Sequence, residues 1–249
     1  MIVMKFGGTS LANAERIKKV GEIIKSRLRK KPIVVVSAVA GVTDSLINLA
    51  KESAKGKNPN KGVEEIINLH KKIIRELSLR ENLIIDECVK LHDLFNGVYL
   101  LKEISPRSLD FIASFGEILS SKIIAEYLNY IGIKSTRYSG WEVGIISDDN
   151  FTNAEVLPET YERVKKFFKK LNGVPVVTGF IAKNRDNEIT TLGRGGSDYT
   201  AAIIGAGLNV KEIEIWTDVD GIKTTDPKIV KGAKQWKRIT FEEDSEMAY

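Results

Sequence analysis

A lysine and two glycines near the amino terminus could bind a phosphate group. The run Lys5-Phe6-Gly7-Gly8-Thr9-Ser10 closes a short apolar segment. Glycines let a backbone approach an anion closely and turn its N–H groups toward it. Lys5 could then neutralise a transferring phosphoryl group as a point charge. The run is neither a Walker A loop nor G-x-G-x-x-G, so from these residues alone it is either a phosphate-binding turn or a tight connection between a strand and a helix.

A second glycine-rich run surrounds an arginine. In Thr191-Leu192-Gly193-Arg194-Gly195-Gly196-Ser197-Asp198, three glycines fall within four residues. An arginine in such a loop suits bidentate recognition of a carboxylate or a phosphate. Ser197 could cap the following helix, and Asp198 in its first turn would favour the helix dipole. A capping role would account for Ser197 and Asp198 without any role in binding, but it does not account for Arg194.

A third polar segment, Trp216 to Lys228, contains Asp218, Asp220 and Asp226. Asp-Gly and Asp-Pro are ordinary turn signals, so the segment has a structural interpretation as well. A metal site is conceivable here, but the twelve-residue EF-hand pattern is missing. His70 lies on an otherwise apolar helical stripe with no second ligand at metal-binding spacing, which favours a partly buried structural histidine.

The elements that must position these motifs follow from hydrophobic periodicity. Predicted strands cover 2–6, 33–36, 134–138, 174–178, 188–192 and 213–217, with a possible edge segment at 144–147. Predicted helices cover 17–28, a segment from 43, 63–78, 82–103, 108–130, 155–171 and 197–206, and 51–62 is expected to be an exposed loop. This alternation predicts an open α/β sheet with helices on both faces. The motifs follow the carboxyl ends of strands, the edge where such sheets bind ligands.

Composition excludes several other classes of protein. The 249 residues are 43% hydrophobic and 29% charged, with a formal charge of +5, as in an ordinary globular protein. Basic runs such as 16–19 and 165–170 alternate with apolar positions, which favours solvated helix faces over a nucleic-acid surface. Cys88 is the lone cysteine and is expected to fill the core. With no signal peptide and no apolar segment of membrane-spanning length, we expect a cytoplasmic protein without a membrane or nucleic-acid partner.

Six segments in order resemble the aspartate kinase branch of the amino acid kinase family. They are Lys5–Ser10, Val36–Ala38, Ser114–Glu117, Val177–Phe180, Thr191–Asp198 and Trp216–Val219. The resemblance spans nearly the whole chain. It implies a three-layer αβα sandwich with a mostly parallel open sheet, forming one catalytic domain over 1–249. It also implies an amino-acid-binding lobe over about 1–172 and a nucleotide-binding lobe over about 173–249.

The same resemblance implies a reaction and its residues. ATP would phosphorylate the side-chain carboxylate of L-aspartate, the first step in making aspartate-family amino acids such as lysine and threonine. Implied catalytic residues are Lys5 and Asp198, with Asp198 orienting Lys5 rather than acting as a base. Implied ATP-binding residues are Lys5, Gly7, Gly8, Thr9, Thr217, Asp218, Lys223, Asp226 and Lys228. Implied aspartate-binding residues are Ser10, Ser37, Thr43, Glu117, Arg194, Gly195 and Ser197.

Two of these implied roles involve charge directly. Glu117 would meet the ammonium group of aspartate, and Arg194 would grip a carboxylate. Mg²⁺ would be held mainly by the ATP phosphates, with no metal site of the protein's own. The carboxylate of aspartate is already ionised near pH 7, so it needs no general base. Catalysis can then consist mostly of positioning and charge neutralisation. A homo-oligomer, such as a dimer, is expected.

The sequence also departs from the family pattern. The family commonly has an aromatic residue where Lys223 stands and an arginine where Lys228 stands, and lysine lacks the bidentate fork. The sequence stops at Tyr249, before a Phe-Gly-Ala-Lys segment and the ACT regulatory domains of the family. We therefore expect the sequence to be part of a longer protein.

Three alternatives remain open from the sequence. The chain could be another amino acid kinase, acting on acetylglutamate, glutamate, carbamate or UMP. It could instead be a nucleotide-binding subunit without catalytic activity, which only senses its ligands. A basic nucleic-acid binder is the third alternative, but it would need a clustered patch with interleaved aromatic residues, and the sequence has none.

Overall fold

The computed structural model describes residues 1–169, 171–218, 221, 232, 234–240, 242 and 243. The chain forms two compact units, Met1–Trp216 and Thr217–Tyr249. In the second unit, the Thr240 N–H donates to Glu243 Oε2 over 2.8 Å and the Glu243 N–H donates to Thr240 Oγ1 over 3.2 Å. This reciprocal pattern is that of a capping box. The predicted division into lobes near residue 172 stays a prediction.

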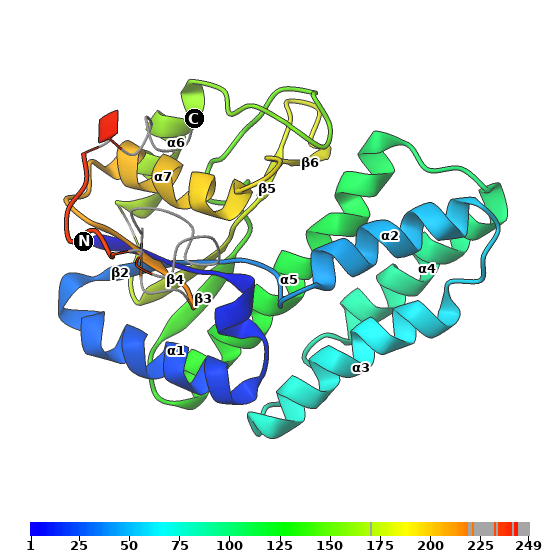
Figure 1. Cartoon of the computed structure of the whole chain (residues 1–249), viewed down its shortest axis with the longest axis horizontal. Coiled ribbons are helices and arrows are strands. Elements are labelled where there is room, and N and C mark those ends of the chain that lie inside the picture. Colours follow the sequence, from blue (N-terminus) through cyan, green and yellow to red (C-terminus); the bar gives the residue numbers. More distant parts are fainter. Residues whose placement is uncertain (170, 219–220, 222–231, 233, 241, 244–249) are drawn as a thin grey trace. The chain divides into compact units, whose positions relative to one another are not determined.

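Five parallel strands form the sheet of the first unit (Figure 1). They are β1 (Ile2–Phe6), β2 (Pro32–Val36), β3 (Ser135–Tyr138), β4 (Val174–Thr178) and β7 (Ile213–Trp216), in the order β3-β4-β2-β1-β7. Phe6 is in register with both Val36 and Trp216, so three strands end side by side. The turns that follow β1 and β2 therefore lie at one edge of the sheet, as predicted.

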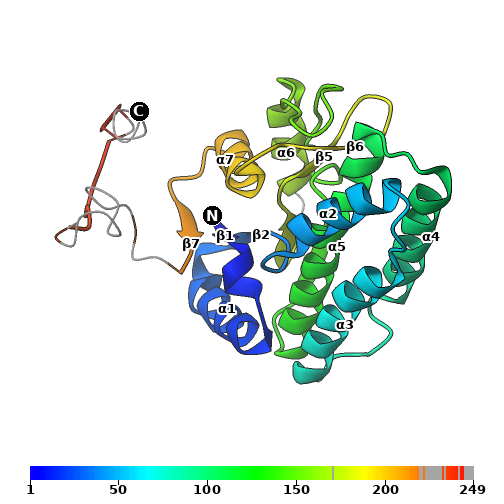
Figure 2. The same cartoon turned by 45° about the vertical axis from the view of Figure 1, so that its right-hand side comes forward.

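Side-chain alternation along the strands creates two cores. Met4 and Val34 face one core, which contains α1 (Ala14–Arg27) and α5 (Pro106–Tyr130). Val3 and Val35 face the other, which contains α6 (Glu159–Phe168) and α7 (Gly196–Leu208). Helices thus cover both faces of the sheet (Figures 1 and 2), which confirms the predicted three-layer α/β architecture.

Three further helices extend the first core beyond the sheet. These are α2 (Val42–Ala54), α3 (Asn60–Glu76) and α4 (Ile85–Leu101), and all three pack with α5 (Figure 2). The buried stripe of α3 includes His70, which is fully buried and whose Nδ1 contacts the Ile66 carbonyl oxygen at 2.8 Å. Cys88 is buried in the same core. Cys88 thus fills the core as predicted, whereas His70 is fully buried rather than partly buried.

Some predicted boundaries were wrong. The expected loop at 51–62 is shorter, because α2 continues to Ala54 and α3 begins at Asn60. Ser53 is buried, and its hydroxyl donates to the Leu49 carbonyl over 2.7 Å, so the last turn of α2 packs despite its polar sequence. The strand β5 (Ile181–Lys183) was not predicted, and it pairs antiparallel with β6 (Ile189–Thr191). Short 3₁₀ helices cover Gly8–Leu11 and Leu28–Lys30.

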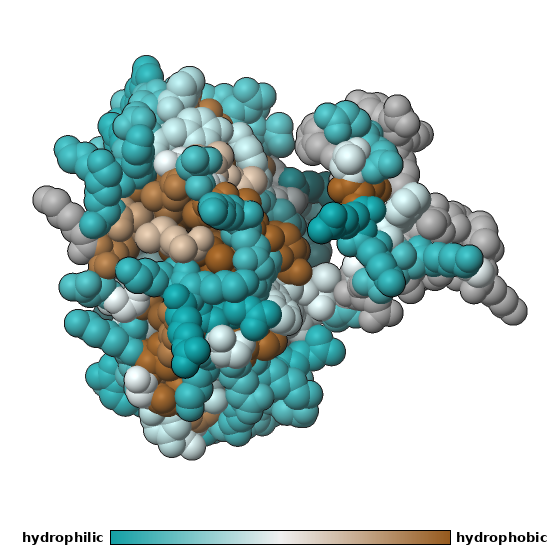
Figure 3. All heavy atoms as spheres, turned by 90° about the vertical axis from the view of Figure 1, so that its left-hand side faces the viewer, coloured by the Kyte–Doolittle hydropathy of each residue, from teal (hydrophilic) through white to brown (hydrophobic). Residues whose placement is uncertain are grey.

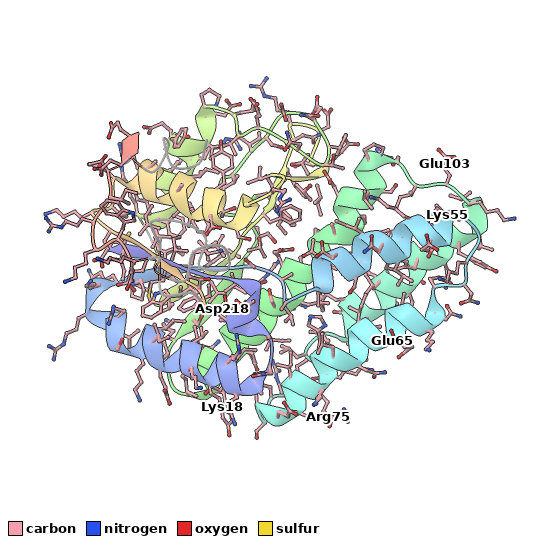
Figure 4. All side chains as sticks on the ribbon, in the orientation of Figure 1. Lys18, Lys55, Glu65, Arg75, Glu103 and Asp218 are labelled. Carbon is pink, nitrogen blue, oxygen red and sulfur yellow. The ribbon has the colours of Figure 1, made fainter. Side chains whose placement is uncertain are left out.

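The charged helix faces are solvated, as the sequence indicates. Lys18 and Lys19 are exposed around the buried Ile17 of α1. Lys165 and Lys166 are exposed beside the buried Val164 of α6. Figure 4 shows Lys18, Glu65 and Arg75 projecting from the outer faces of α1 and α3. Such interleaving of charge with buried apolar positions is the pattern of an amphipathic helix.

Candidate active site

A hollow of about 610 Å³ opens at the carboxyl ends of the strands. Residues of β1, of the turn after β2, of α5 and of the glycine-rich segment before α7 line it together. The predicted site residues among them are Lys5, Gly8, Ser37, Thr43, Glu117, Arg194, Gly195, Ser197 and Asp198. The opposite edge of the sheet has a smaller hollow of about 390 Å³, and the described residues that line it include no acidic residue. Apolar side chains gather on this face of the molecule (Figure 3).

Lys5 reaches the hollow from β1, which lies between β2 and β7 in the sheet. In β1 its side chain alternates with that of Met4 and lies on the face covered by α7. Its Nζ forms an ion pair with Asp198 Oδ1 at 2.8 Å. The lysine side chain is only 11% exposed, whereas that of Asp198 is 51% exposed. The first turn of α7 therefore holds the ammonium group of Lys5 at the mouth of the hollow.

The turn after β1 is held close to the turn after β2. A Cβ atom on Gly8 would lie 2.8 Å from the Ala38 carbonyl oxygen, so a larger residue would force the two turns apart. The Ala40 N–H donates to the Gly8 carbonyl over 3.2 Å. The Arg16 guanidinium donates to the Thr9 carbonyl over 2.7 Å. Gly7, Thr9 and Ser10 belong to this turn but do not line the hollow.

Glu117 is a buried acid whose position depends on its neighbour Gly116. A Cβ on Gly116 would lie 2.7 Å from Ala38 Cβ, so glycine allows α5 to approach the segment after β2. Glu117 Oε1 then accepts a hydrogen bond from the Ala38 N–H over 3.0 Å. Its Oε2 has no partner among the residues that the structure describes. Burial raises the pKa of Glu117 to about 8, although the Ala38 N–H opposes this shift.

The glycines around Arg194 are required by the backbone. Gly193 and Gly195 have φ values of 68° and 72°, which strongly favour glycine. A Cβ on Gly196 would lie 2.8 Å from the Phe180 ring. No hydrogen bond or ion pair joins Arg194 to any residue in the described part of the chain, and it is exposed on the rim. Its guanidinium is therefore available to an anion.

The start of α7 corrects one prediction. Gly195, not Ser197, is the N-cap of this helix, and no side chain caps it. Ser197 is instead buried within the first turn, where a Cβ on Gly179 would lie 2.5 Å from its Oγ. The left-handed conformation of Gly195 starts the helix two residues earlier than a cap at Ser197 would. Asp198 does lie in the first turn, as predicted.

Sequence reasoning missed Asp110, which is 1% exposed and lines the hollow. Its Oδ2 accepts hydrogen bonds from the backbone N–H groups of Thr152 and Thr191, both over 2.9 Å. Its Oδ1 accepts from the Thr191 hydroxyl over 2.8 Å. Burial raises the pKa of Asp110 against these bonds. The sequence could have indicated that Asp110 belongs to the site, because it lies seven residues before Glu117 and therefore on the same face of one helix.

The remaining predicted residues lie in the second unit. Thr217 and Asp218 directly follow β7, and the Thr217 hydroxyl donates to Asp218 Oδ1 over 3.3 Å. Lys223, Asp226 and Lys228 lie outside the described residues. Among the residues that are described, no group of three His, Cys, Asp or Glu side chains is arranged to hold a metal ion. None of the helices in the described ranges has the length and apolar character of a membrane span.

Comparisons with known proteins agree on one family. The sequence model of the amino acid kinase family matches residues 1–249. The chain is 44% identical over 257 residues to aspartokinase 3, chloroplastic, of Arabidopsis thaliana, covering 99% of this chain and 46% of that protein. It is 36% identical over 250 residues to the aspartokinase of Rickettsia felis, covering 100% of this chain and 51% of that protein. The chain thus spans about half the length of the curated relatives it matches.

A solved structure agrees with this assignment. The structure of E. coli aspartokinase III in complex with aspartate and ADP superposes with a TM-score of 0.87 at 32% sequence identity. The match covers 100% of this chain and 56% of that one. The similarity therefore includes the whole sheet and the segments that line the hollow.

Proposed function

The chain belongs to the amino acid kinase family, and on that premise we propose that it transfers the γ-phosphoryl group of ATP to the side-chain carboxylate of L-aspartate. One observation carries this proposal. A single hollow is lined by Lys5, by Arg194 and by the buried Glu117, and neither Arg194 nor Glu117 Oε2 has a partner among the described residues. These two cations and this acid match an acceptor with a carboxylate and an ammonium group, together with an incoming phosphoryl group.

The amino acid would be bound at two of its groups. Arg194 offers paired N–H donors to a carboxylate, which favours bidentate binding. Glu117 Oε2 would accept a hydrogen bond from the ammonium group, and the positive charge would favour ionisation of this buried acid. Ser37, Thr43, Gly195 and Ser197 line the same hollow and would complete the amino-acid site, with Ser10 at its border.

The phosphoryl group would be transferred next to Lys5. An oxygen of the ionised side-chain carboxylate forms a bond to the γ-phosphorus as the bond from that phosphorus to the β-phosphate oxygen breaks, and ADP leaves. Lys5 neutralises the charge on the transferring group, and its ion pair with Asp198 holds it in place. Asp198 accepts no proton in this step, because the attacking carboxylate carries none near pH 7.

The nucleotide would contact the turn of Gly7, Gly8 and Thr9, with the backbone N–H groups of Gly8 and Thr9 as donors, because that of Gly7 donates to the Trp216 carbonyl over 3.3 Å. Thr217 and Asp218, with Lys223, Asp226 and Lys228, are proposed as further ATP-binding residues. Asp198 forms an ion pair with Lys5, so its carboxylate is not offered to a metal ion. The residues of the site therefore fit an Mg²⁺ ion that is held mainly by the ATP phosphates. When bound there, Mg²⁺ neutralises charge on the phosphates.

We place this reaction at the start of the synthesis of lysine, threonine and related amino acids. A cytoplasmic location is supported by the lone cysteine, which is buried and unpaired. Of the relatives named above, the plant protein is called chloroplastic. A homodimer remains part of the proposal.

A panel of acceptors tests the substrate. ADP release would be followed with Mg-ATP and L-aspartate, L-glutamate, N-acetylglutamate, carbamate or UMP. Hydroxylamine would trap any acyl phosphate as a hydroxamate. We expect ADP and hydroxamate in equal amounts with L-aspartate and little of either with the other acceptors. A different preferred acceptor would overturn the aspartate assignment within the same family, and nucleotide binding without turnover would favour a sensor.

A further inference from the structure

We propose that Asp110 is a positioning residue, which fixes the segment 191–196 so that Arg194 can bind the carboxylate of the acceptor. This inference deepens the proposed function and rests on it. Asp110 is buried, yet no cation pairs with its carboxylate in the described part of the chain. A buried acid without a counter-ion is costly, so its three hydrogen bonds must serve a structural purpose.

Those three hydrogen bonds connect segments that are distant in sequence. Asp110 lies in the first turns of α5, Thr152 in the segment before α6, and Thr191 at the end of β6. The segments at 152–154 and 191–193 also contact each other directly. The Ala154 N–H donates to the Thr191 carbonyl over 2.8 Å, and a Cβ on Gly193 would clash with the Asn153 side chain. Asp110 therefore fixes the point from which the glycine-rich segment leaves β6.

The glycine-rich segment is fixed at its other end by α7. The Gly196 N–H donates to the Gly193 carbonyl over 3.1 Å, and Gly195 begins the helix. Arg194 lies between these two anchors and makes no hydrogen bond or ion pair with the described residues. Its backbone position is consequently set by the Asp110 contacts on one side and by α7 on the other.

One rigid helix then relates both ends of the acceptor site. Asp110 and Glu117 are seven residues apart on α5, which corresponds to a rise of about 10.5 Å at 1.5 Å per residue. Glu117 itself faces the hollow, and Asp110 holds the segment of Arg194. The helix thereby sets the distance between the acid proposed for the ammonium group and the arginine proposed for the carboxylate.

The role of Asp110 is geometric rather than electrostatic. All three donors are neutral, and a negative charge near the hollow would oppose an anionic acceptor. Asparagine could reproduce the arrangement, because its oxygen can accept both backbone N–H groups while its NH₂ donates to the Thr191 hydroxyl. Alanine would leave the two backbone donors unsatisfied.

The test compares Asp110→Ala with Asp110→Asn. Asp148→Ala is the matched control, because the Asp148 carboxylate accepts hydrogen bonds from the N–H groups of Asn150 and Glu155 in the same loop, and neither of these donors belongs to β6. Hydrogen exchange of peptides covering 190–197 is measured without ligand, and binding of L-aspartate is measured by calorimetry. We expect Asp110→Ala to accelerate this exchange about tenfold or more and to weaken aspartate binding by about 10- to 100-fold. Asp110→Asn and the control should stay within about threefold of the wild type in both measurements.

Unchanged hydrogen exchange in Asp110→Ala would overturn the inference. So would an Asp110→Asn variant that exchanges as fast and binds aspartate as weakly as Asp110→Ala, because this would indicate a role for the charge. If Asp110→Ala does not fold, Thr191→Val supplies the test, because it removes one hydroxyl at constant shape and should weaken aspartate binding by about threefold or more. A wild-type chain that binds no aspartate would contradict the proposed function instead, since the exchange measurement needs no ligand.

Discussion

Lys5 and Glu117 illustrate how differently two charged residues depend on their surroundings. The position of Lys5 follows from its own strand, because alternation in β1 directs it toward α7 and Asp198. Glu117, by contrast, accepts its hydrogen bond from the Ala38 N–H, 79 residues away in sequence. The place of Lys5, on a strand that ends in two glycines, could thus be predicted from local sequence. The raised pKa of Glu117 could not, because it requires the tertiary burial that α5 imposes.

The raised pKa predicts that acceptor binding depends on pH. Below about 8 the free carboxyl of Glu117 is protonated, whereas the form that binds an ammonium group is ionised, so binding releases a proton. The Kd for L-aspartate should therefore fall about tenfold per pH unit from pH 6 to 7 and level off above about 8. Calorimetry in buffers with different ionisation enthalpies measures both the Kd and the released proton.

Glu117→Gln provides the control for this pH dependence. The amide does not titrate, so aspartate should bind weakly and with a Kd that hardly changes between pH 6 and 8. If the wild type also bound aspartate with a constant Kd, Glu117 would not be the group that meets the ammonium.

A separate prediction concerns Lys5. Replacing it with alanine removes the cation proposed to neutralise the transferring group, so kcat should fall by about 10² to 10³. The KM for L-aspartate should change little, because Arg194 and Glu117 remain. Lys18→Ala, which removes an exposed lysine from the outer face of α1, should leave kcat unchanged (Figure 4). Equal loss in both variants would indicate a general effect of charge rather than a local one.

At the scale of the elements, the close approach of α5 to the turn after β2 determines the site. Gly116 lets the helix lie against Ala38 and Thr43 and so brings Glu117 to the Ala38 N–H. Periodicity predicted this helix. It could not predict a glycine-mediated contact, because that depends on how the helix is docked. The strand β5 was not predicted, because a segment of three residues is too short to show a clear hydrophobic period.

Gly116→Ala tests this contact. The added methyl group would meet Ala38 Cβ at 2.7 Å, so the helix must shift, and the free energy of unfolding should fall by about 1–3 kcal/mol. Aspartate binding should weaken as Glu117 moves. Gly97→Ala in α4 is the control, because nothing lies within 4 Å of the added atom and alanine favours a helix by up to about 1 kcal/mol. A stabilised, fully binding Gly116→Ala variant would contradict the argument.

At the scale of the whole molecule, alternating strands and helices predicted the α/β class and the edge of the sheet at which the hollow lies. The strand order β3-β4-β2-β1-β7 could not be predicted from that pattern, because the chain crosses the sheet through connections of very different length. The hollow arises from that order, since it brings the turns after β1 and β2 beside the segment that enters α7. Segments more than 180 residues apart in sequence, those of Lys5 and Arg194, therefore line one site.

The central claim is that an oxygen of the aspartate side chain attacks the γ-phosphorus of ATP. The most direct measurement uses L-aspartate labelled with ¹⁸O in its side-chain carboxylate, with Mg-ATP and hydroxylamine. Hydroxylamine attacks the carbonyl carbon of the acyl phosphate, so the released phosphate keeps the bridging oxygen. We predict phosphate with one ¹⁸O atom, detected by its ³¹P isotope shift, in proportion to ADP. Unlabelled phosphate, or ADP formation independent of aspartate, would mean that water or another acceptor is phosphorylated and would contradict the account.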